Sequence, residues 1–410
     1  MYIAQPLTLP CGVILKNRLA KSAMSENMGT SDHHSNIKFE NVYERWAQGG
    51  CALVISGNVM IDSQSMGEPR NVVIENGFNG SDELKKWTQA GTKNNTQLWM
   101  QINHPGKQSP KFLNKTPVSP SAIALKPPLD RLFNKPRELT EAEIHSIIER
   151  FIYTAKIAKQ AGFTGVQIHG AHGYLVSQFL SPLHNQRTDQ WGGSLPNRMR
   201  FVLEVYKNMR IELGDRFPIS IKLNSADFQK GGFTEGESMQ VVQALSEQGV
   251  DLIEISGGTY EAPEMTGVNR QEKMSTIQRE AYFTEYCEKV RSQIKTPLML
   301  TGGFRSLTGM ESALEKKSCD MIGLARSLAL NPNFAQELLS GKNTISAVKP
   351  LSTGIKTLDQ LFPLEITWYT NQIQRMGDGK NPNPNASVLA SVFHTVSSLG
   401  LQGLKRVRAK

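Results

Sequence analysis

Short apolar segments alternate with longer amphipathic segments through most of this 410-residue chain, and this alternation restricts the fold more than any other feature. Eight of the apolar segments have the length and composition of buried strands. They span residues 19–24, 52–56, 98–102, 165–168, 219–223, 252–255, 298–301 and 321–324. Strands that alternate with helices pair in parallel through right-handed crossovers, and eight such units can close into a barrel. We therefore predict an α/β protein with a TIM (β/α)8 barrel.

Helical patterns fill several intervals between these strands, at residues 140–159, 195–213, 235–247 and 280–292. The first begins with Thr140 and has Glu143 three residues later, a pair that caps the start of a helix. Glycines such as Gly162 and Gly214 can end a helix and turn the chain back toward the sheet. An open doubly wound sheet is the alternative, but no GxGxxG turn follows the first predicted strand.

Two segments interrupt the alternation. Residues 103–139 follow the third strand and contain seven prolines, and connections of this length are usually functional or disordered. We interpret this segment as a stiffened flap that covers a ligand at the mouth of the barrel. Residues 341–410 follow the last barrel unit and have helical patterns at 358–376 and 386–404. The expected organisation is a barrel at residues 1–340 and a C-terminal helical extension that packs on the barrel or on a neighbouring subunit.

Composition is that of an ordinary globular protein, with 39% hydrophobic and 20% charged residues. No apolar run reaches the ~18 residues of a membrane span, and no signal-peptide pattern is present. The net charge of +9 is spread along the chain without a nucleic-acid-binding motif, so we expect no nucleic-acid partner. The basic stretch at 405–410 is interpreted as a solvated tail, with an anionic partner or a membrane surface as the alternative.

The four cysteines, Cys11, Cys51, Cys287 and Cys319, are widely separated. Their spacing fits neither a disulfide framework nor a zinc or iron–sulfur site, which favours a reducing, cytoplasmic setting.

Chemistry in such barrels collects at the carboxyl ends of the strands. The fourth predicted strand is followed by His169, His172 and Tyr174, three side chains that can handle protons. A histidine pair alone also fits core residues or metal ligands. No nearby carboxylate or cysteine completes a ligand set, so we expect no metal.

Other strand ends carry further candidate residues. Gly57, after the second strand, would let a flat ligand approach the backbone. Gln101, at the end of the third, offers a donor and an acceptor that suit an imide edge. Lys222 lies among apolar residues of the fifth strand and should therefore meet an anion. The end of the first strand contributes Ala23, Met24 and Ser25.

The seventh and eighth strands end in glycine turns, with Gly302 and Gly303 after one and Ala325 and Arg326 after the other. In TIM barrels a phosphate commonly binds at this place, on backbone N–H groups and a nearby cation. A phosphate site, an amide that reads a planar ring and a buried lysine together fit flavin mononucleotide (FMN), because a cation near the ring stabilises its anionic reduced form.

With these residues in place, the chain resembles the Old Yellow Enzyme family over about residues 7–334. The most specific matching runs are HGAHGYL at 169–175, QFLSP at 178–182 and NQRTDQWGGS at 185–194. The resemblance implies an FMN-bearing TIM barrel in which NADH or NADPH reduces the flavin, leaves, and is replaced at the same site by an activated alkene. It also implies that His169 and His172 bind the electron-withdrawing oxygen and that Tyr174 donates a proton.

Two positions depart from the pattern that the resemblance implies. Ser25 stands where relatives carry a threonine or a cysteine, and Lys222 stands where many carry an arginine, which keeps the charge but loses the bidentate geometry. Oxidative chemistry on an amine or alcohol, and a non-catalytic flavin-binding protein, stay open as alternatives. So do the choice between NADH and NADPH, the substrate, and association into a homo-oligomer.

Overall fold

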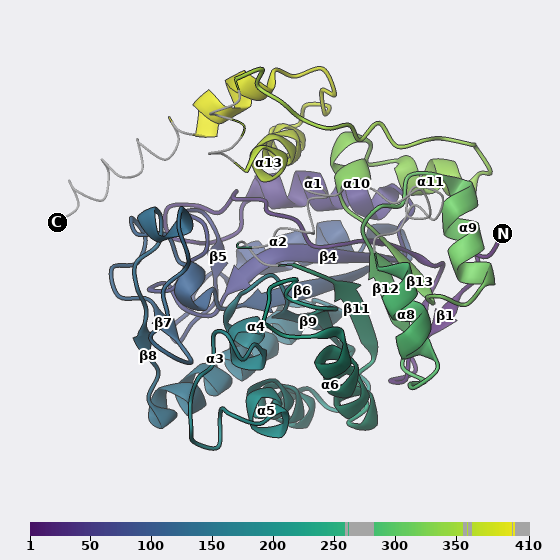
Figure 1. The fold of residues 1–410 in the computed structure, drawn as a ribbon. Helices are drawn as coiled ribbons and strands as arrows, with labels where there is room; N and C mark the ends of the chain where they lie inside the picture. The colour runs from purple at the N-terminus through teal and green to yellow at the C-terminus, as the bar shows by residue number, and fades with distance from the viewer. Residues whose placement is uncertain (259–260, 262–282, 356–358, 360–362, 396, 398–410) are drawn as a thin grey trace.

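The computed structural model describes residues 1–258, 261, 283–355, 359, 363–395 and 397 of the chain. Eight parallel strands form the barrel seen at the centre of Figure 1. They are β3 (Leu19–Lys21), β4 (Leu53–Met60), β6 (Gln97–Asn103), β9 (Gly165–Gly170), β10 (Ile219–Asn224), β11 (Leu252–Ser256), β12 (Leu298–Thr301) and β13 (Met321–Leu324). The spatial order is β3-β13-β12-β11-β10-β9-β6-β4, and pairing of β3 with β4 closes the ring. The predicted TIM barrel is confirmed, and the open sheet is excluded.

Four strands, β6, β9, β10 and β11, are one or two residues longer than predicted, so His169 lies within β9 rather than after it. Two other strands differ more. β3 ends at Lys21, three residues early, because Lys21 is paired with Leu324, the last residue of β13. β4 instead continues to Met60, with a register shift against β6 between Ile55 and Asn58. A bulge of this kind lets a strand continue past an irregular residue, so Gly57 lies within β4 rather than after it.

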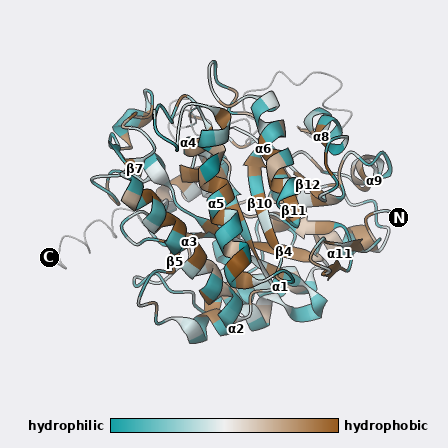
Figure 2. Ribbon diagram, turned by 90° about the horizontal axis from the view of Figure 1, so that it is seen from below, coloured by the Kyte–Doolittle hydropathy of each residue, from teal (hydrophilic) through white to brown (hydrophobic). Residues whose placement is uncertain are grey.

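Helices surround the barrel, and in Figure 2 they carry both hydrophilic and hydrophobic stretches, as expected of elements with one buried face. The predictions are confirmed for α3 (Glu141–Ala161), α5 (Leu195–Leu213) and α6 (Glu235–Glu247). α8 (Thr284–Arg291) matches the fourth pattern, whose residues 280–282 lie outside the described residues. The remaining barrel helices, not predicted, are α1 (Ile37–Gln48), α2 (Ser81–Gly91), α4 (Leu175–Leu180), α9 (Leu307–Glu315), α10 (Arg326–Leu330) and α11 (Phe334–Leu339).

The capping signals that predicted α3 have the expected geometry. Thr140 and Glu143 form a reciprocal capping box, in which each side chain accepts a hydrogen bond from the backbone of the other. Gly162 ends the helix at φ 96°, a left-handed conformation that residues other than glycine rarely adopt.

The barrel interior has an apolar lower layer and a polar upper layer. The lower layer includes Ala20, Leu53, Ile55, Trp99, Leu252, Met299 and Met321. The upper layer, nearer the carboxyl ends of the strands, comprises Ser22, Gln101, Gln167, Lys222, Glu254 and Thr301, which are linked to one another by hydrogen bonds.

An N-terminal hairpin, which the sequence analysis did not predict, packs against the lower layer. Its strands are β1 (Leu7–Thr8) and β2 (Ile14–Leu15), and its leucines join the same apolar cluster. The backbone N–H of Cys11 donates to Asp251, the residue that precedes β11, at 2.9 Å. The hairpin therefore covers the end of the barrel opposite the carboxyl ends of the strands.

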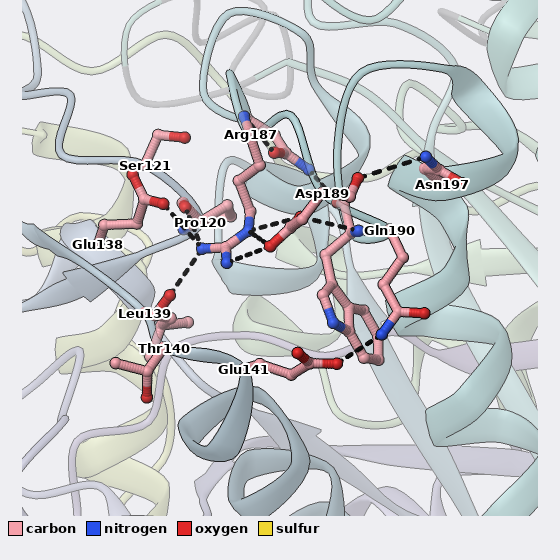
Figure 3. A network of polar contacts seen from close by, with 12 residues as sticks. Pro120, Ser121, Glu138, Leu139, Thr140, Glu141, Arg187, Asp189, Gln190 and Asn197 are labelled. Carbon is pink, nitrogen blue, oxygen red and sulfur yellow. Dashed lines mark hydrogen bonds and ion pairs between the residues drawn. The ribbon is translucent and has the colours of Figure 1, made fainter.

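Residues 103–139 contain short elements and are held in place by one buried arginine. The elements are η2 (Gly106–Gln108), η3 (Leu129–Arg131) and the parallel pair β7 (Val118–Ser119) and β8 (Arg137–Glu138). Arg187 donates to the carbonyl oxygens of Pro120 and Leu139 and forms an ion pair with Asp189 at 2.6 Å, as Figure 3 shows. This buried, charge-assisted network fixes the middle of the segment, at Pro120, and its C-terminal end, at Leu139.

In the C-terminal extension, α13 (Leu364–Gly377) lies beside α1 and α10, at the top of Figure 1. Its Thr370 hydroxyl donates to the carbonyl oxygen of Ser25 at 3.2 Å, and Gln374 donates to the next two carbonyls of the same loop. Residues 388–395 are also helical. Residues 358 and 360–362 of one predicted helix, residues 396 and 398–404 of the other, and the basic tail lie outside the described residues.

The four cysteines are free thiols, three of them buried. Burial raises the pKa of the Cys11 thiol to about 11 and that of Cys51 to about 12, and it also raises the pKa values of Cys287 and Cys319. Within the described part of the chain, no helix combines the length and apolarity that crossing a bilayer requires.

Candidate active site

A cavity opens at the carboxyl ends of the strands, as predicted for the barrel. Every predicted site residue except Gly57 lines it: Ala23, Met24, Ser25, Gln101, His169, His172, Tyr174, Lys222, Gly302, Gly303, Ala325 and Arg326. The lining residues include none from 103–139. Closure of that segment over a ligand therefore stays a prediction. One wall of the cavity instead comes from α13, through Glu365, Ile366, Tyr369, Thr370 and Ile373.

Gly57 does not face the cavity. A Cβ atom at this position would lie 2.6 Å from the carbonyl oxygen of Met24 and 2.8 Å from Oε2 of Glu26. The glycine is therefore required for the close approach of β4 to the loop after β3. The prediction that Gly57 lets a ligand approach the backbone has no support in this position, because β4 continues beyond the residue.

The two histidines form one hydrogen-bonded row. His169 Nδ1 lies 2.8 Å from Oδ1 of Asn58, and His169 Nε2 lies 3.2 Å from Nδ1 of His172. The row ends at Ser256, whose Oγ lies 2.8 Å from His172 Nε2. Tyr174 is adjacent, with its ring centroid 4.8 Å from that of His169.

Backbone contacts also fix His172. Its φ is 62°, in the left-handed region, and its N–H donates to Oδ1 of Asn224 at 3.1 Å. Its carbonyl oxygen accepts from Nε2 of Gln108 at 3.0 Å, so the segment 103–139 supports the site from outside the cavity. A strained residue held by several contacts is typical of a functional position.

Burial keeps both imidazoles neutral. It lowers the pKa of His172 to about 3 and the pKa of His169 well below its usual value, and the nearby Lys222 cation contributes in both cases. A neutral imidazole has one N–H and one acceptor nitrogen. If the Ser256 hydroxyl donates to Nε2 of His172, then Nδ1 of that ring carries the proton and points toward His169.

Lys222 meets the anion that the sequence required. Its Nζ lies 3.1 Å from Oε1 of Glu254 on β11, and both side chains are buried. Glu254 also accepts from Thr301 at 2.7 Å and from Gln167 at 2.9 Å. A buried pair whose other lone pairs are satisfied in this way places a cation at the cavity wall without an uncompensated charge.

The glycine turn after β12 and the residues after β13 also line the cavity. Gly302 and Gly303 have φ of 110° and 92°, which residues with a side chain rarely adopt. Arg326 lies nearby, and its guanidinium is 6.0 Å from the ring of Tyr369 on α13. Among the described residues, the Tyr369 hydroxyl is buried without a hydrogen-bond partner. This group of donors and a cation suits an anionic tail.

Several residues that the sequence analysis did not select belong to the site. Asn224 and Ser256 end β10 and β11, Asn58 follows the predicted second strand, and each contacts a histidine. The strand-end rule applied throughout would therefore have found them. Glu68 lines the cavity and accepts from the Ser25 hydroxyl, and burial raises the pKa of its carboxyl group. Tyr369 carried no signal, because it is distant in sequence from the barrel.

These features match FMN part by part. Gln101 can meet an imide edge, Lys222 supplies a cation, and the glycine turns with Arg326 can hold a phosphate. The described residues contain no cluster of side chains suited to a metal ion. A TIM barrel with this cavity defines the class: a flavin-dependent oxidoreductase.

Comparison with known proteins agrees with this class. The model of the NADH:flavin oxidoreductase / NADH oxidase family matches residues 3–344, and the chain belongs to this family. An NADH-dependent flavin oxidoreductase, iliE, of Hypocrea jecorina is 35% identical over 81% of this chain and 87% of its own length. An NADPH dehydrogenase of Clostridium acetobutylicum is 31% identical over 80% and 92%.

The old yellow enzyme homologue of Zymomonas mobilis has the same fold, with a TM-score of 0.72, 22% identity, and coverage of 85% of this chain and 95% of that one. The family match over residues 3–344, together with this shared fold, confirms the resemblance to the Old Yellow Enzyme family. The protein is an FMN- and NAD(P)H-dependent oxidoreductase.

Proposed function

We propose that this enzyme reduces carbon–carbon double bonds that are activated by a conjugated oxygen, in a ping-pong cycle. NAD(P)H and the alkene would occupy the same cavity in turn. The observation that carries the proposal is the grouping of a neutral histidine pair and a tyrosine in one cavity with Gln101 and Lys222. Bound FMN, once reduced, supplies the hydride.

The histidines would bind the electron-withdrawing oxygen of the substrate. As neutral rings they donate hydrogen bonds without placing a positive charge on the oxygen before hydride transfer. His172 Nδ1 already points toward the partner ring, and a substrate oxygen between the two rings would replace their mutual contact. His169 donates from Nε2 to this oxygen when Asn58 turns its amide to donate to Nδ1.

Tyr174 would donate the proton that completes the reduction. It is the N-cap residue of α4 and is buried against His169, which orients its ring. Lys222 would supply the cation beside the flavin ring, and Glu254 would limit the net charge of the pair. The segment 103–139 would restrict access of water to the cavity.

The test separates the two half-reactions. Purified protein should be yellow, and anaerobic mixing with NADH or NADPH in a stopped-flow instrument should bleach the flavin. Tyr174→Phe should slow reoxidation by an α,β-unsaturated ketone by ~100-fold or more, because general acid catalysis contributes about that much, while flavin reduction changes little. An equal loss of rate in both half-reactions would show that Tyr174 is not the proton donor. A colourless protein that takes up no FMN would refute the proposal.

A further inference from the structure

A row of three hydrogen-bonded side chains leads from a buried carboxylate, that of Glu254, to the cavity wall. Glu254 Oε2 accepts from Nε2 of Gln167 at 2.9 Å, and Gln167 Oε1 accepts from Nε2 of Gln101 at 2.7 Å. All three are at most 1% exposed. Gln101 lines the cavity, whereas Glu254 and Gln167 lie behind it.

The charge of Glu254 fixes the direction of this chain. Lys222 and Thr301 both approach its Oε1, so an ionised, acceptor-only carboxylate directs Oε2 at Gln167. Gln167 must then turn its NH2 group toward Glu254 and its carbonyl oxygen toward Gln101. Gln101 must in turn donate, although the amide ends of a glutamine are otherwise nearly interchangeable.

The consequence is a defined edge at the cavity. One N–H of Gln101 is used by Gln167, which leaves its carbonyl oxygen and its second N–H. No hydrogen bond to Gln101 Oε1 occurs within the described part of the chain. An acceptor beside a donor is complementary to an imide, where an N–H lies next to a carbonyl oxygen.

We propose that Glu254 is a positioning residue that sets the polarity of Gln101 and thereby selects a ring with an N–H next to a carbonyl group. The proposal rests on the assignment of Gln101 to the ring of FMN. Glu254 itself touches neither the cavity nor a ligand, and acts through Gln167.

Glu254→Gln should reverse the direction of the hydrogen bonds from residue 254 through Gln167 to Gln101, while the side chain at residue 254 keeps its size. The new amide oxygen would stay with Lys222 and Thr301, so its NH2 group would face Gln167. Gln167 and then Gln101 would have to accept, and Gln101 would present N–H groups alone. Two donors would then oppose each other at the imide N–H, which should weaken FMN binding by about 10- to 100-fold.

The experiment measures the binding of FMN and of N3-methyl-FMN to apoprotein by quenching of flavin fluorescence. The methylated flavin has no imide N–H, so the ratio of the two dissociation constants reports the contact with Gln101. The wild-type protein should prefer FMN by at least about tenfold. Glu254→Gln should bring the ratio close to one. A loss of affinity equal for both flavins would overturn the proposal, because general destabilisation would cause it.

A double variant provides the matched control. In Glu254→Gln/Gln167→Glu the carboxylate moves one place along the chain and again requires Gln101 to donate, so the preference for FMN should return. A folded double variant that keeps a ratio near one would overturn the proposal. Should Glu254→Gln fail to fold, Gln167→Met interrupts the hydrogen bonds between Glu254 and Gln101 while leaving the ion pair of Lys222 and Glu254 intact. This variant should also reduce the preference for FMN over N3-methyl-FMN. An unchanged ratio of the two dissociation constants would again count against the proposal.

Failure of the proposed ene reduction would appear differently. The flavin ratios would then follow the proposal while the alkene failed to reoxidise the reduced enzyme. Failure of the Glu254 proposal would leave both half-reactions intact and the ratio unaffected by the variants.

Discussion

The lower and upper layers of the barrel interior come from the same strands and differ by a step of two residues. Along β12 the step leads from Met299 to Thr301, and along β11 from Leu252 to Glu254. Two residues along a strand cover about 6.6 Å on one face. Over that distance the interior changes from an apolar contact surface to a network in which each polar side chain is hydrogen-bonded to another.

The difference shows how one fold separates stability from chemistry. In the lower layer any apolar side chain of similar volume can satisfy its neighbours. In the upper layer the removal of one member leaves buried charges or amides without partners. Substitutions in the two layers should therefore differ in cost even when they change a similar number of atoms.

The largest expected effect comes from Glu254→Leu. It would leave Lys222 as a buried cation without its carboxylate and should lower the free energy of unfolding by about 3–5 kcal/mol. Met299→Leu, a substitution of similar volume in the lower layer, should cost less than about 1.5 kcal/mol. Urea unfolding of the two variants measures both values. Similar costs would show that the layers do not differ in the way described.

The next largest effect concerns crowding in the upper layer. A Cβ atom at Gly323 would lie 2.0 Å from Oγ1 of Thr301 and 2.5 Å from Oγ of Ser22. Gly323→Ala should therefore lower the free energy of unfolding by about 1–3 kcal/mol. In a double-mutant cycle, Thr301→Ala should recover part of that loss by removing the nearer atom. Strict additivity of the two substitutions would contradict this account.

The smallest effect concerns pH. Burial lowers the folded-state pKa of His172 to about 3, so between pH 6.5 and 3 the unfolded chain binds a proton at this residue that the folded chain does not. Stability is thus fully present above the unfolded pKa of about 6.5 and declines as the pH falls, by about 1.4 kcal/mol per pH unit for each such histidine. His172→Asn should reduce the slope measured at pH 4–5.5 by that amount, and Met299→Leu should not. An unchanged slope in His172→Asn would contradict neutral burial of this ring.

Much of the upper layer was open to prediction from the sequence. Lys222 lies in a buried strand and required an anion, and Glu254 is the one acidic residue within the eight predicted strands. The sequence analysis predicted an anion for Lys222 without naming it, and the count of acidic residues would have pointed to Glu254, which lies 3.1 Å away in the structure. The strand-end rule found Gln101 and the histidine pair for the same reason: in parallel strands, local sequence determines which residues reach the mouth.

The rest depended on contacts between distant parts of the chain. The hairpin strands β1 and β2 have two residues each, too few for a periodic signal, and their burial is decided by the lower layer. The position of α13 over the cavity depends on Thr370 meeting the carbonyl of Ser25, 345 residues away in sequence. Gly57 was misplaced because a bulge depends on the register of the neighbouring strand, which sequence periodicity does not contain.

The thiols of this protein have a consequence for its durability. Reduced flavins that meet dioxygen form hydrogen peroxide, and peroxide attacks thiolates rather than thiols. All four cysteines have a raised pKa and three are buried, so almost no thiolate exists near neutral pH. We therefore expect peroxide that forms in air to convert these cysteines to sulfenic acids only slowly.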